Sequence, residues 1–308
     1  MRISAFSMCR NADSLYYPVE ESIRSVLDLV DEMVIAVGEG LPGDRSVQII
    51  QAIDSPKIRI IRTNWDIVRY PKGTVHAQQT DLAKEHCTGD WLIYLQADEV
   101  LHEGDHHEIF EACRQSLSDP KVEGFLFHYL HFWGDYEHLV TGHSWYEREI
   151  RIVRNQPEIH SWQSAQSFRW YDQFTGNYQS KYGNRKLRVR QLNARIYHYG
   201  WVRPPALMTQ KMNALDQVHS HKEKRFSSVF DYGNLSKMSR FNGSHPAVMQ
   251  KRIQQLDWED GLKIRSHIPL NRKKMKHEKW RYRMLSFIEE KIVGGKRLGV
   301  FRNYTLID

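Results

Sequence analysis

A chain of 308 residues is long enough for one catalytic domain with an appended region, and its 41% hydrophobic content argues against a largely disordered protein. The net charge of +7 and the pI of about 9.2 imply an anionic partner, such as nucleic acid, a membrane surface or a phosphorylated substrate. Three scattered cysteines suggest neither a disulfide framework nor a zinc knuckle, and no apolar stretch reaches the roughly 18 residues of a membrane-spanning helix. We therefore expect a cytoplasmic protein that is soluble or peripheral at a membrane.

The first hundred residues alternate between strand and helix patterns. We predict strands over 2–8, 32–38, 57–63 and 91–97, one helix beginning at Pro18, and another over 73–89. Pro18 suits the first helical position, and Glu20 and Glu21 follow in the first turn, where the helix dipole favours acidic groups. This alternation indicates an α/β fold with a parallel sheet and helices on its faces.

The stretch DWLIYLQADEVLHE (90–103) marks the predicted ligand-binding edge of this sheet. A buried strand ends there, and Gln96, Asp98 and Glu99 follow it without a turn residue. Ligands of parallel sheets bind beyond the carboxyl ends of the strands, where a carboxylate can approach a cation that a nucleotide diphosphate also coordinates. The alternative is a solvated acidic loop that caps the next helix.

After residue 119 the pattern changes. Strands are predicted over 124–134 and 146–155, and the region up to Tyr199 is rich in the aromatic and amide side chains that are common where sugars bind. A further strand in ARIYHYGWVRPP (194–205) ends in His198, an available metal ligand, and Arg203 follows as a group for phosphate. A single histidine among sixteen is, however, more often structural or merely exposed.

The chain after Pro204 has a helical pattern, and Lys263 to Arg302 contains thirteen Lys or Arg against three Glu. This stretch could be a phosphoinositide-like or nucleic-acid surface, a solvated helix face, or, through residues 271–283, a contact with an anionic membrane. We predict a catalytic domain over 1–205, with halves 1–119 and 120–205, and a helical, basic region over 206–308.

Several of these motifs together resemble bacterial family-2 glycosyltransferases of the GT-A fold. The motifs are Arg10–Asn11 after the first strand, Glu39 after the second, HAQQTDLAK (76–84), GDWLIYLQADEVLHE (89–103), WYEREIRIVRN (145–155), SAQSFR (164–169) and YHYGWVRPP (197–205). The resemblance spans most of residues 1–205 and extends weakly to FRNYTLI (301–307). It implies a mostly parallel nucleotide-binding sheet, a nucleotide-sugar donor, a divalent metal and inversion at the anomeric carbon, in the synthesis of a polysaccharide, lipopolysaccharide or similar glycan.

The resemblance also implies site residues. Those expected to bind the nucleotide sugar are Arg10, Asn11, Glu39, Gln79, Gln96, Asp98 and Arg203. Asp98 and His198 would hold Mg²⁺ or Mn²⁺. The family's Asp-x-Asp motif is QAD (96–98) in this chain, and the neutral Gln96 implies a metal that is weakly held or dispensable. Trp145, Tyr146, Trp162 and Trp201 are expected to bind a glycan or lipid-linked acceptor.

An inverting transfer needs a base that takes the proton of the acceptor hydroxyl. Where similar sequences often carry an acidic residue, this chain has Ser164. Glu149 is the first candidate and Glu147 the second. The alternative is that Glu149 forms a structural salt bridge with Arg151 or Arg169.

Two other function classes stay open. A sugar-phosphate nucleotidyltransferase would carry a glycine-rich loop with Arg or Lys after its first strand, and SMCRNADSLYY (7–17) lacks one. A non-enzymatic nucleic-acid-binding protein would explain the pI, but the cations concentrate at the C-terminus and the aromatic residues before it. Nucleic acid is therefore not the expected partner.

Overall fold

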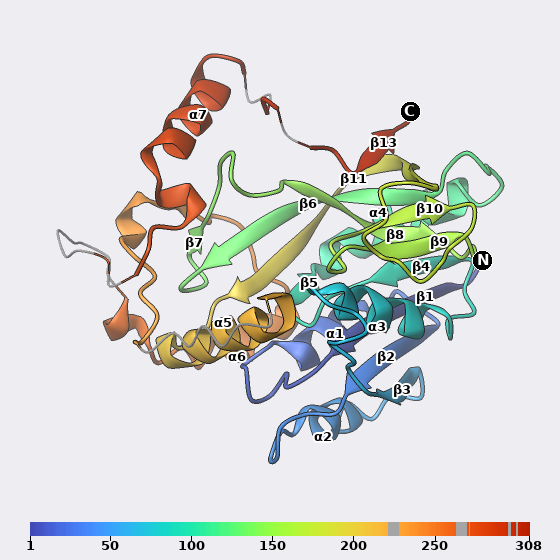
Figure 1. Ribbon diagram of the computed structural model, residues 1–308, viewed down its shortest axis with the longest axis horizontal. Helices are drawn as coiled ribbons and strands as arrows, with labels where there is room; N and C mark the ends of the chain where they lie inside the picture. The colour runs from blue at the N-terminus through green and yellow to red at the C-terminus, as the bar shows by residue number, and fades with distance from the viewer. Residues whose placement is uncertain (221–227, 263–269, 271, 295–296, 300) are drawn as a thin grey trace.

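The computed structural model describes residues 1–220, 228–262, 270, 272–294, 297–299 and 301–308. A twisted sheet forms the centre of the molecule (Figure 1), with the strand order β3-β2-β1-β4-β8-β6-β11-β10-β9. Its strands are β1 (Ile3–Cys9), β2 (Glu32–Gly38), β3 (Ile58–Thr63), β4 (Trp91–Tyr94), β6 (Gly124–Trp133), β8 (Arg148–Arg154), β9 (Ile159–Trp162), β10 (Ser167–Tyr171) and β11 (Asn184–Trp201). Four shorter strands join its margins, β5 (Glu99–Leu101), β7 (His138–Leu139), β12 (Ser239–Arg240) and β13 (Tyr304–Leu306).

The first half of the sheet is parallel, as the β/α alternation predicts. Strands β3, β2, β1 and β4 pair in parallel, and each predicted strand is present, although β4 is shorter than expected. Helix α1 (Val19–Leu27) packs on one face against alternate residues such as Ala5 and Ile35, and α3 (Thr74–Lys84) covers the other face, where Phe6 and Val34 lie. Burial on both faces explains why these strands read as continuous apolar runs.

The second half of the sheet is mixed, with antiparallel as well as parallel neighbours. Strand β8 runs antiparallel to both β4 and β6, and β10 runs antiparallel to β9 and β11, while β6 and β11 are parallel. Residues 134–147, between β6 and β8, contain no helix. A parallel return needs a crossover connection, usually helical, so the chain comes back antiparallel.

Three helices differ from the sequence-based prediction. The helix predicted over 73–89 ends at Lys84. Helices α2 (Ser46–Gln51) and α4 (His106–Gln115) were not predicted. Helix α2 is only six residues long, and α4 opens with two histidines and a glutamate rather than with an apolar stripe, which explains why neither gave a clear helical signal.

The region after residue 205 shares a hydrophobic core with the sheet. It contains α5 (Pro205–Ser220), α6 (Gln250–Gln254) and α7 (Trp280–Lys291), and β13 near the C-terminus pairs in parallel with β11. Phe230, Tyr232 and Trp258 pack in one cluster with Trp133 of β6 and Tyr199 of β11. Of the basic stretch Lys263–Arg302, residues 263–269, 271, 295–296 and 300 lie outside the described part of the chain. No helix in the described part is both long and apolar enough to cross a membrane.

The two acidic residues after Ala97 have different surroundings, because Glu99 lies in the core and Asp98 lies at the ligand-binding edge. Glu99 lies in β5, is fully buried, and accepts two hydrogen bonds of 2.8 Å from the Arg151 guanidinium. The Tyr129 hydroxyl donates a third bond to it, also at 2.8 Å. Since β5 pairs with β11, Glu99 is a structural residue, and only Asp98 of the pair faces the candidate site.

Replacing Glu99 by glutamine is expected to lower the free energy of unfolding by about 3–5 kcal/mol, because Arg151 would remain buried without a counter-charge. Chemical denaturation measures this change. Glu111→Gln is the control, since it removes an exposed partner of Arg114 and is expected to leave the midpoint unchanged. Equal midpoints for wild type and Glu99→Gln would show that the buried ion pair does not support the fold.

Candidate active site

A cavity of about 260 Å³ lies at the carboxyl ends of β1 and β4, where ligands of parallel sheets bind. The loop after β1 contributes Arg10, and the segment after β4 contributes Gln96 and Asp98. Six residues predicted from the sequence line this cavity, namely Arg10, Gln96, Asp98, Tyr146, His198 and Trp201. The fold therefore brings together side chains that are up to 191 positions apart in the sequence.

Asp98 is buried inside the cavity wall and does not belong to a solvated loop. Only 6% of the residue is exposed, and its Oδ2 lies 3.2 Å from the Lys211 Nζ and 3.8 Å from the His198 Nε2. Burial alone would raise the pKa of the Asp98 carboxyl, but Lys211, followed by His198 and Arg203, lowers it to about 2. Asp98 is thus an anion at any physiological pH.

His198 presents an unprotonated nitrogen to Asp98. Burial lowers the pKa of His131 to about 3 and that of His198 to about 4, so both rings are neutral near pH 7. The His131 Nε2 lies 2.8 Å from the Tyr146 carbonyl and must donate to it, and the two Nδ1 atoms lie 2.9 Å apart. His131 Nδ1 is then the acceptor, His198 Nδ1 is the donor, and the lone pair of His198 Nε2 points toward the Asp98 side.

A carboxylate oxygen beside an imidazole lone pair fits a cation with mixed oxygen and nitrogen ligands, such as Mn²⁺. The close approach depends on Gly200, because a Cβ there would lie 2.5 Å from the His198 Nε2 and 2.7 Å from the Asp98 Oδ2. The described residues contain no group of three or more His, Cys, Asp or Glu arranged for a metal. Among the described residues, the two groups that could contribute to such a site are the Asp98 carboxylate and the His198 imidazole.

Lys211 is the cation that contacts Asp98, and it was not identified from the sequence. It comes from the middle of α5, and its Nζ donates to the Gly200 carbonyl at 2.6 Å and lies 4.9 Å from the centre of the Tyr17 ring. Burial lowers the pKa of Lys211 to about 7, with Arg203 adding to the shift and Asp98 opposing it. Its sequence signal was available, because Lys211 is the only charged residue in PALMTQKMNAL (205–215).

No protein-family model matches the sequence, and no curated protein is similar to it at a significant level. Similar solved structures include TarS of S. aureus, with a TM-score of 0.41 and 13% identity over 70% of this chain and 39% of TarS. They also include S. aureus TarS 1-349 in complex with UDP, with a TM-score of 0.40 and 11% identity over 71% of this chain and 65% of that one. The mannosyltransferase PcManGT from Pyrobaculum calidifontis, in complex with GDP-Man and Mn²⁺, has a TM-score of 0.29 and 18% identity over 40% of this chain and 34% of its own.

The chain spans less than two thirds of the length of each of these proteins.

Arg203, which was expected to bind phosphate, does not line the cavity. It is fully buried, donates to the carbonyls of Leu15 and Gly200, and lies 4.6 Å from the Tyr17 ring centre. These contacts tie the β1–α1 loop to the end of β11. Lys211, which contacts the same carbonyl and the same tyrosine ring, does line the cavity.

The remaining residues expected to bind the nucleotide lie around the loops after β1 and β2. Arg10 donates from its Nε to the Glu39 carbonyl at 2.8 Å and lies 5.7 Å from the ring centre of Trp65, which also lines the cavity. Asn11 accepts a hydrogen bond of 2.7 Å from the Leu41 amide. Glu39 lines a separate cavity of about 410 Å³. Trp65 was missed from the sequence because an isolated tryptophan between β3 and α3 forms no motif.

Gln79 does not reach the cavity. It is fully buried, its Nε2 donates to the Asn64 carbonyl at 3.0 Å, and its Oε1 accepts from the Thr63 hydroxyl. These bonds fix the end of β3 and the segment that carries Trp65. The structure therefore places Gln79 behind the site, where it supports the wall.

The two candidate bases have different surroundings. The Glu147 Oε1 accepts a bond of 2.7 Å from the Arg297 Nε, so Glu147 holds the C-terminal segment. Glu149 is half-buried, its Oε2 is buried without a hydrogen-bond partner among the described residues, and desolvation raises its pKa to about 7 against the lowering effect of Arg151. The predicted alternative of a salt bridge to Arg151 is not observed, because Arg151 pairs with Glu99. Arg169, the other predicted partner of Glu149, has its guanidinium 4.5 Å from the centre of the Trp162 ring.

The four predicted acceptor aromatics separate into two groups. Tyr146 and Trp201 line the 260 Å³ cavity, and Trp145 packs 5.9 Å from the Trp201 ring centre. Trp162 lies on β9, under Arg169 and away from the cavity. The Trp145 Nε1 also lies 3.4 Å from His277, which lines a larger cavity of about 520 Å³. Trp145 therefore sits between two cavities.

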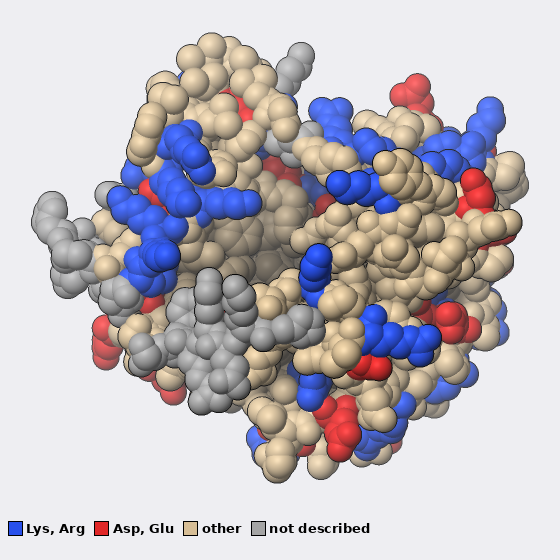
Figure 2. Space-filling model, viewed as in Figure 1, with Lys and Arg blue, Asp and Glu red and all other residues tan. Residues whose placement is uncertain are grey.

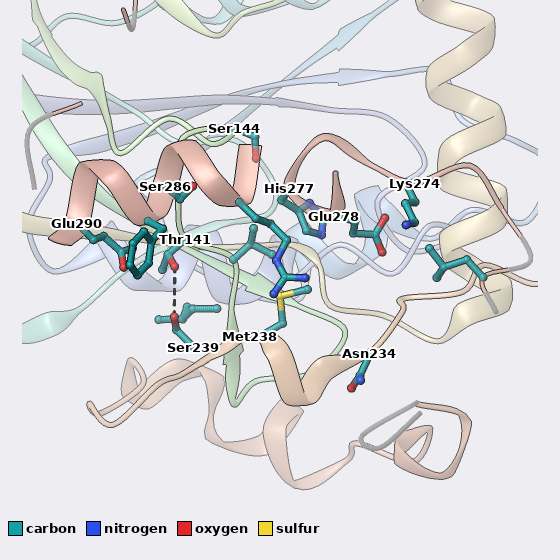
Figure 3. Close-up of a pocket in the computed structure, with 15 residues that line it drawn as sticks. Thr141, Ser144, Asn234, Met238, Ser239, Lys274, His277, Glu278, Ser286 and Glu290 are labelled. Carbon is teal, nitrogen blue, oxygen red and sulfur yellow. Dashed lines mark hydrogen bonds between the residues drawn. The ribbon is translucent and has the colours of Figure 1, made fainter. Parts of the chain in front are cut away.

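The larger cavity is bounded by α7 on one side and by β7 and β12 on the other (Figure 3). Thr141 and Ser239, which face each other across its floor, are 3.2 Å apart between their hydroxyl oxygens. Lys274 and Arg283 add positive charge, and Glu278 and Glu290 add negative charge. None of the residues predicted from the sequence for donor or metal binding lines this cavity.

Proposed function

We propose that the protein is an inverting glycosyltransferase that moves a sugar from a nucleotide-sugar donor to a hydroxyl of a glycan or lipid-linked acceptor. The observation that carries this proposal is the cluster of Asp98, His198 and Lys211 in a cavity at the carboxyl ends of parallel strands. A carboxylate and a cation side by side suit a phosphorylated ligand, and the aromatic lining suits a base and a sugar. The proposal includes a role in cell-surface polysaccharide or lipopolysaccharide synthesis and membership of the family that the sequence resembles.

The donor would occupy the cavity with its base toward Arg10 and Trp65 and its diphosphate toward Asp98, His198 and Lys211. A divalent metal held by Asp98 and His198 would supply positive charge to the leaving diphosphate. Buried groups that already carry charge need little reorganisation as the bond breaks, so they stabilise the transition state strongly.

Glu149 is the proposed base. Its raised pKa of about 7 suits a group that must accept a proton near neutral pH, and its buried Oε2 has no hydrogen-bond partner among the described residues. The acceptor hydroxyl gives its proton to Glu149, its oxygen forms a bond to the anomeric carbon, and the bond from that carbon to the diphosphate oxygen breaks on the opposite face. Trp145, Tyr146 and Trp201 are proposed to hold the acceptor, because Tyr146 directly precedes the strand segment that carries Glu149.

The loop after β1 argues against the alternative of a nucleotidyltransferase. Such an enzyme would offer backbone amides of this loop to the phosphates. Here the amides of Ala12 and Asp13 donate to the Ser46 hydroxyl, and the amide of Ser14 donates to Asp44. The loop amides are thus engaged by the chain itself.

A panel of nucleotide sugars tests the proposed function directly. Thermal unfolding is measured with UDP-, GDP- and TDP-sugars, with and without Mn²⁺. We expect one nucleotide class to raise the melting temperature, because a ligand that binds only the folded state stabilises it by mass action. If no nucleotide sugar shifts the transition and none is consumed with any acceptor tested, the proposal is wrong.

Helix α7 is proposed as a peripheral contact with an anionic membrane at the inner face of the plasma membrane. Trp280, Met284 and Phe287 are each more than half exposed and follow the i, i+4, i+7 spacing of one helical face. Figure 2 shows Lys and Arg side chains gathered over the end of the molecule that contains α7, beside a hollow in the surface. Exposed apolar groups bordered by cations suit a surface of anionic lipids, which would also hold a lipid-linked acceptor close.

Pelleting with liposomes tests this contact. We expect binding to vesicles that contain anionic lipid, little binding to neutral vesicles, and loss of binding in the double variant Trp280→Ser, Met284→Ser. Tyr182→Ser is the matched control, because Tyr182 is another highly exposed aromatic residue that lies outside α7. Equal binding to neutral and anionic vesicles would refute the electrostatic part of the proposal.

A further inference from the structure

More positive than negative charge is buried in and behind the walls of the 260 Å³ cavity. Lys211 and Arg203 are both buried near Asp98, and the positive charge of each lowers the pKa of that carboxyl. Arg151 also lines the cavity, but Glu99 balances its charge completely. Arg203 donates to carbonyl oxygens and not to a carboxylate. Two cations therefore share one anion, Asp98, and a buried excess of positive charge attracts an anionic ligand.

Lys211 lies on the face of α5 that forms a wall of this cavity. Leu215 and His219, one and two turns further along the helix, line the cavity as well. A lysine side chain is a compact charge on a flexible stem, so its ammonium can move between acceptors while the helix stays in place. Arg203 lacks this freedom, since its guanidinium is held by two carbonyls and lies against Tyr17.

We propose that Lys211 binds the diphosphate of the donor, and that its contact with Asp98 is the resting position of the ammonium when no nucleotide is present. This inference rests on the proposed function and names the residue that holds the leaving group. The ammonium has three donors, and Asp98 and Gly200 are two of its acceptors here. A diphosphate oxygen replaces one of them without leaving the charge of Lys211 unpaired.

The position of Lys211 also makes it independent of the metal for binding. Its ammonium already lies 3.2 Å from the Asp98 Oδ2, the oxygen that a metal shared with His198 would use. The ammonium and a metal would thus use the same oxygen, and the proposal is that Lys211 moves onto the phosphate and holds the diphosphate without a metal.

Nucleotide affinity separates this role from a merely structural one. Binding of UDP, GDP and TDP, each beside its monophosphate, is measured calorimetrically in EDTA for the wild type and for Lys211→Met. We expect the diphosphate that binds the wild type to bind the variant about 10- to 100-fold more weakly, since a charge-assisted hydrogen bond is lost. The monophosphate should bind both proteins with similar affinity.

Two further variants show whether a loss of nucleotide binding is caused by unfolding of the protein. Lys84→Met is the matched control, because Lys84 is equally buried but donates to the Gln156 carbonyl, away from the cavity. The double variant Lys211→Met, Asp98→Asn removes both charges of the pair and so leaves no unpaired charge in the core. It should also discriminate poorly between diphosphate and monophosphate.

Three outcomes are distinguishable. If Lys211→Met binds the diphosphate as tightly as the wild type, or loses both nucleotides by the same factor, the inference is overturned. If the wild type binds the diphosphate only when Mn²⁺ is added, the metal and not Lys211 holds it, and the inference is again overturned while the proposed function stands. If no nucleotide binds the wild type with or without Mn²⁺, the proposed function itself fails.

Discussion

Replacing Glu149 by glutamine is expected to lower kcat for sugar transfer about 10²- to 10⁴-fold, because the amide cannot take the proton of the acceptor hydroxyl. Binding of the nucleotide sugar should change little, since Glu149 does not line the donor cavity. Initial rates and donor affinity, measured on the same preparation, separate these two effects. Glu123→Gln is the control, because Glu123 is also buried but pairs with Arg185 and Arg188.

The pKa of Glu149 fixes the sign of two pH effects. The rate of transfer should rise with pH up to about 7, where the carboxylate form becomes predominant, and should then level off. Stability follows the opposite course, because a carboxyl whose pKa is raised on folding destabilises the folded state as pH rises through about 7. Glu149→Gln removes this penalty, so at pH 8 the variant should be more stable than the wild type by about 1–3 kcal/mol.

A purely structural role of Glu149 would give different kinetic and stability results. If it were a structural anion, the glutamine variant would lose stability and activity together, and the rate profile would lack an inflection near pH 7. That combination would remove Glu149 from the mechanism, and the base would have to be sought elsewhere.

Asp98→Asn is expected to lower kcat/KM for transfer about 10²- to 10³-fold. The variant loses the carboxylate that is proposed to position the metal and Lys211 next to the diphosphate. Asparagine is a better test than alanine because of the surroundings of Asp98. The residue is buried against Lys211, so alanine would leave a buried ammonium without its partner and would destabilise the protein. Asparagine keeps the shape and still accepts a hydrogen bond from Lys211.

The control for Asp98→Asn is Asp81→Asn. Asp81 is equally buried, lies 2.8 Å from the His160 Nδ1, and accepts from the Ser161 amide, but it does not line the cavity. Kinetics of both variants with saturating donor, together with their thermal unfolding, provide the comparison. A near-normal rate for Asp98→Asn, or an equal loss of rate in both variants, would contradict a role of Asp98 at the donor.

The parallel half of the sheet was predictable because its strands are short apolar runs separated by amphipathic helices, and this pattern is local. The position of Asp98 followed from the same pattern, since it lies in the short segment between β4 and β5. The mixed half was not predictable, because the pairing of β8 with both β4 and β6 depends on contacts far apart in the chain.

Local sequence patterns likewise could not predict which residues contact the site residues. Lys211 stands out as the only charged residue in 205–215, but it lies 113 positions from Asp98, and the helical pattern of α5 does not indicate which side chain its ammonium contacts. Arg203 and Glu99 were expected at the ligand because they stand beside motif residues. Their side chains instead turn into the core, and which way a side chain turns depends on strand register and loop geometry.

A crystal structure with the nucleoside diphosphate selected by the binding panel would test the central claim most directly. We predict that the diphosphate lies in the cavity at the ends of β1 and β4, within hydrogen-bond distance of the Lys211 Nζ and next to Asp98, with the base near Trp65. A nucleotide bound at another surface, with the 260 Å³ cavity empty, would contradict the account.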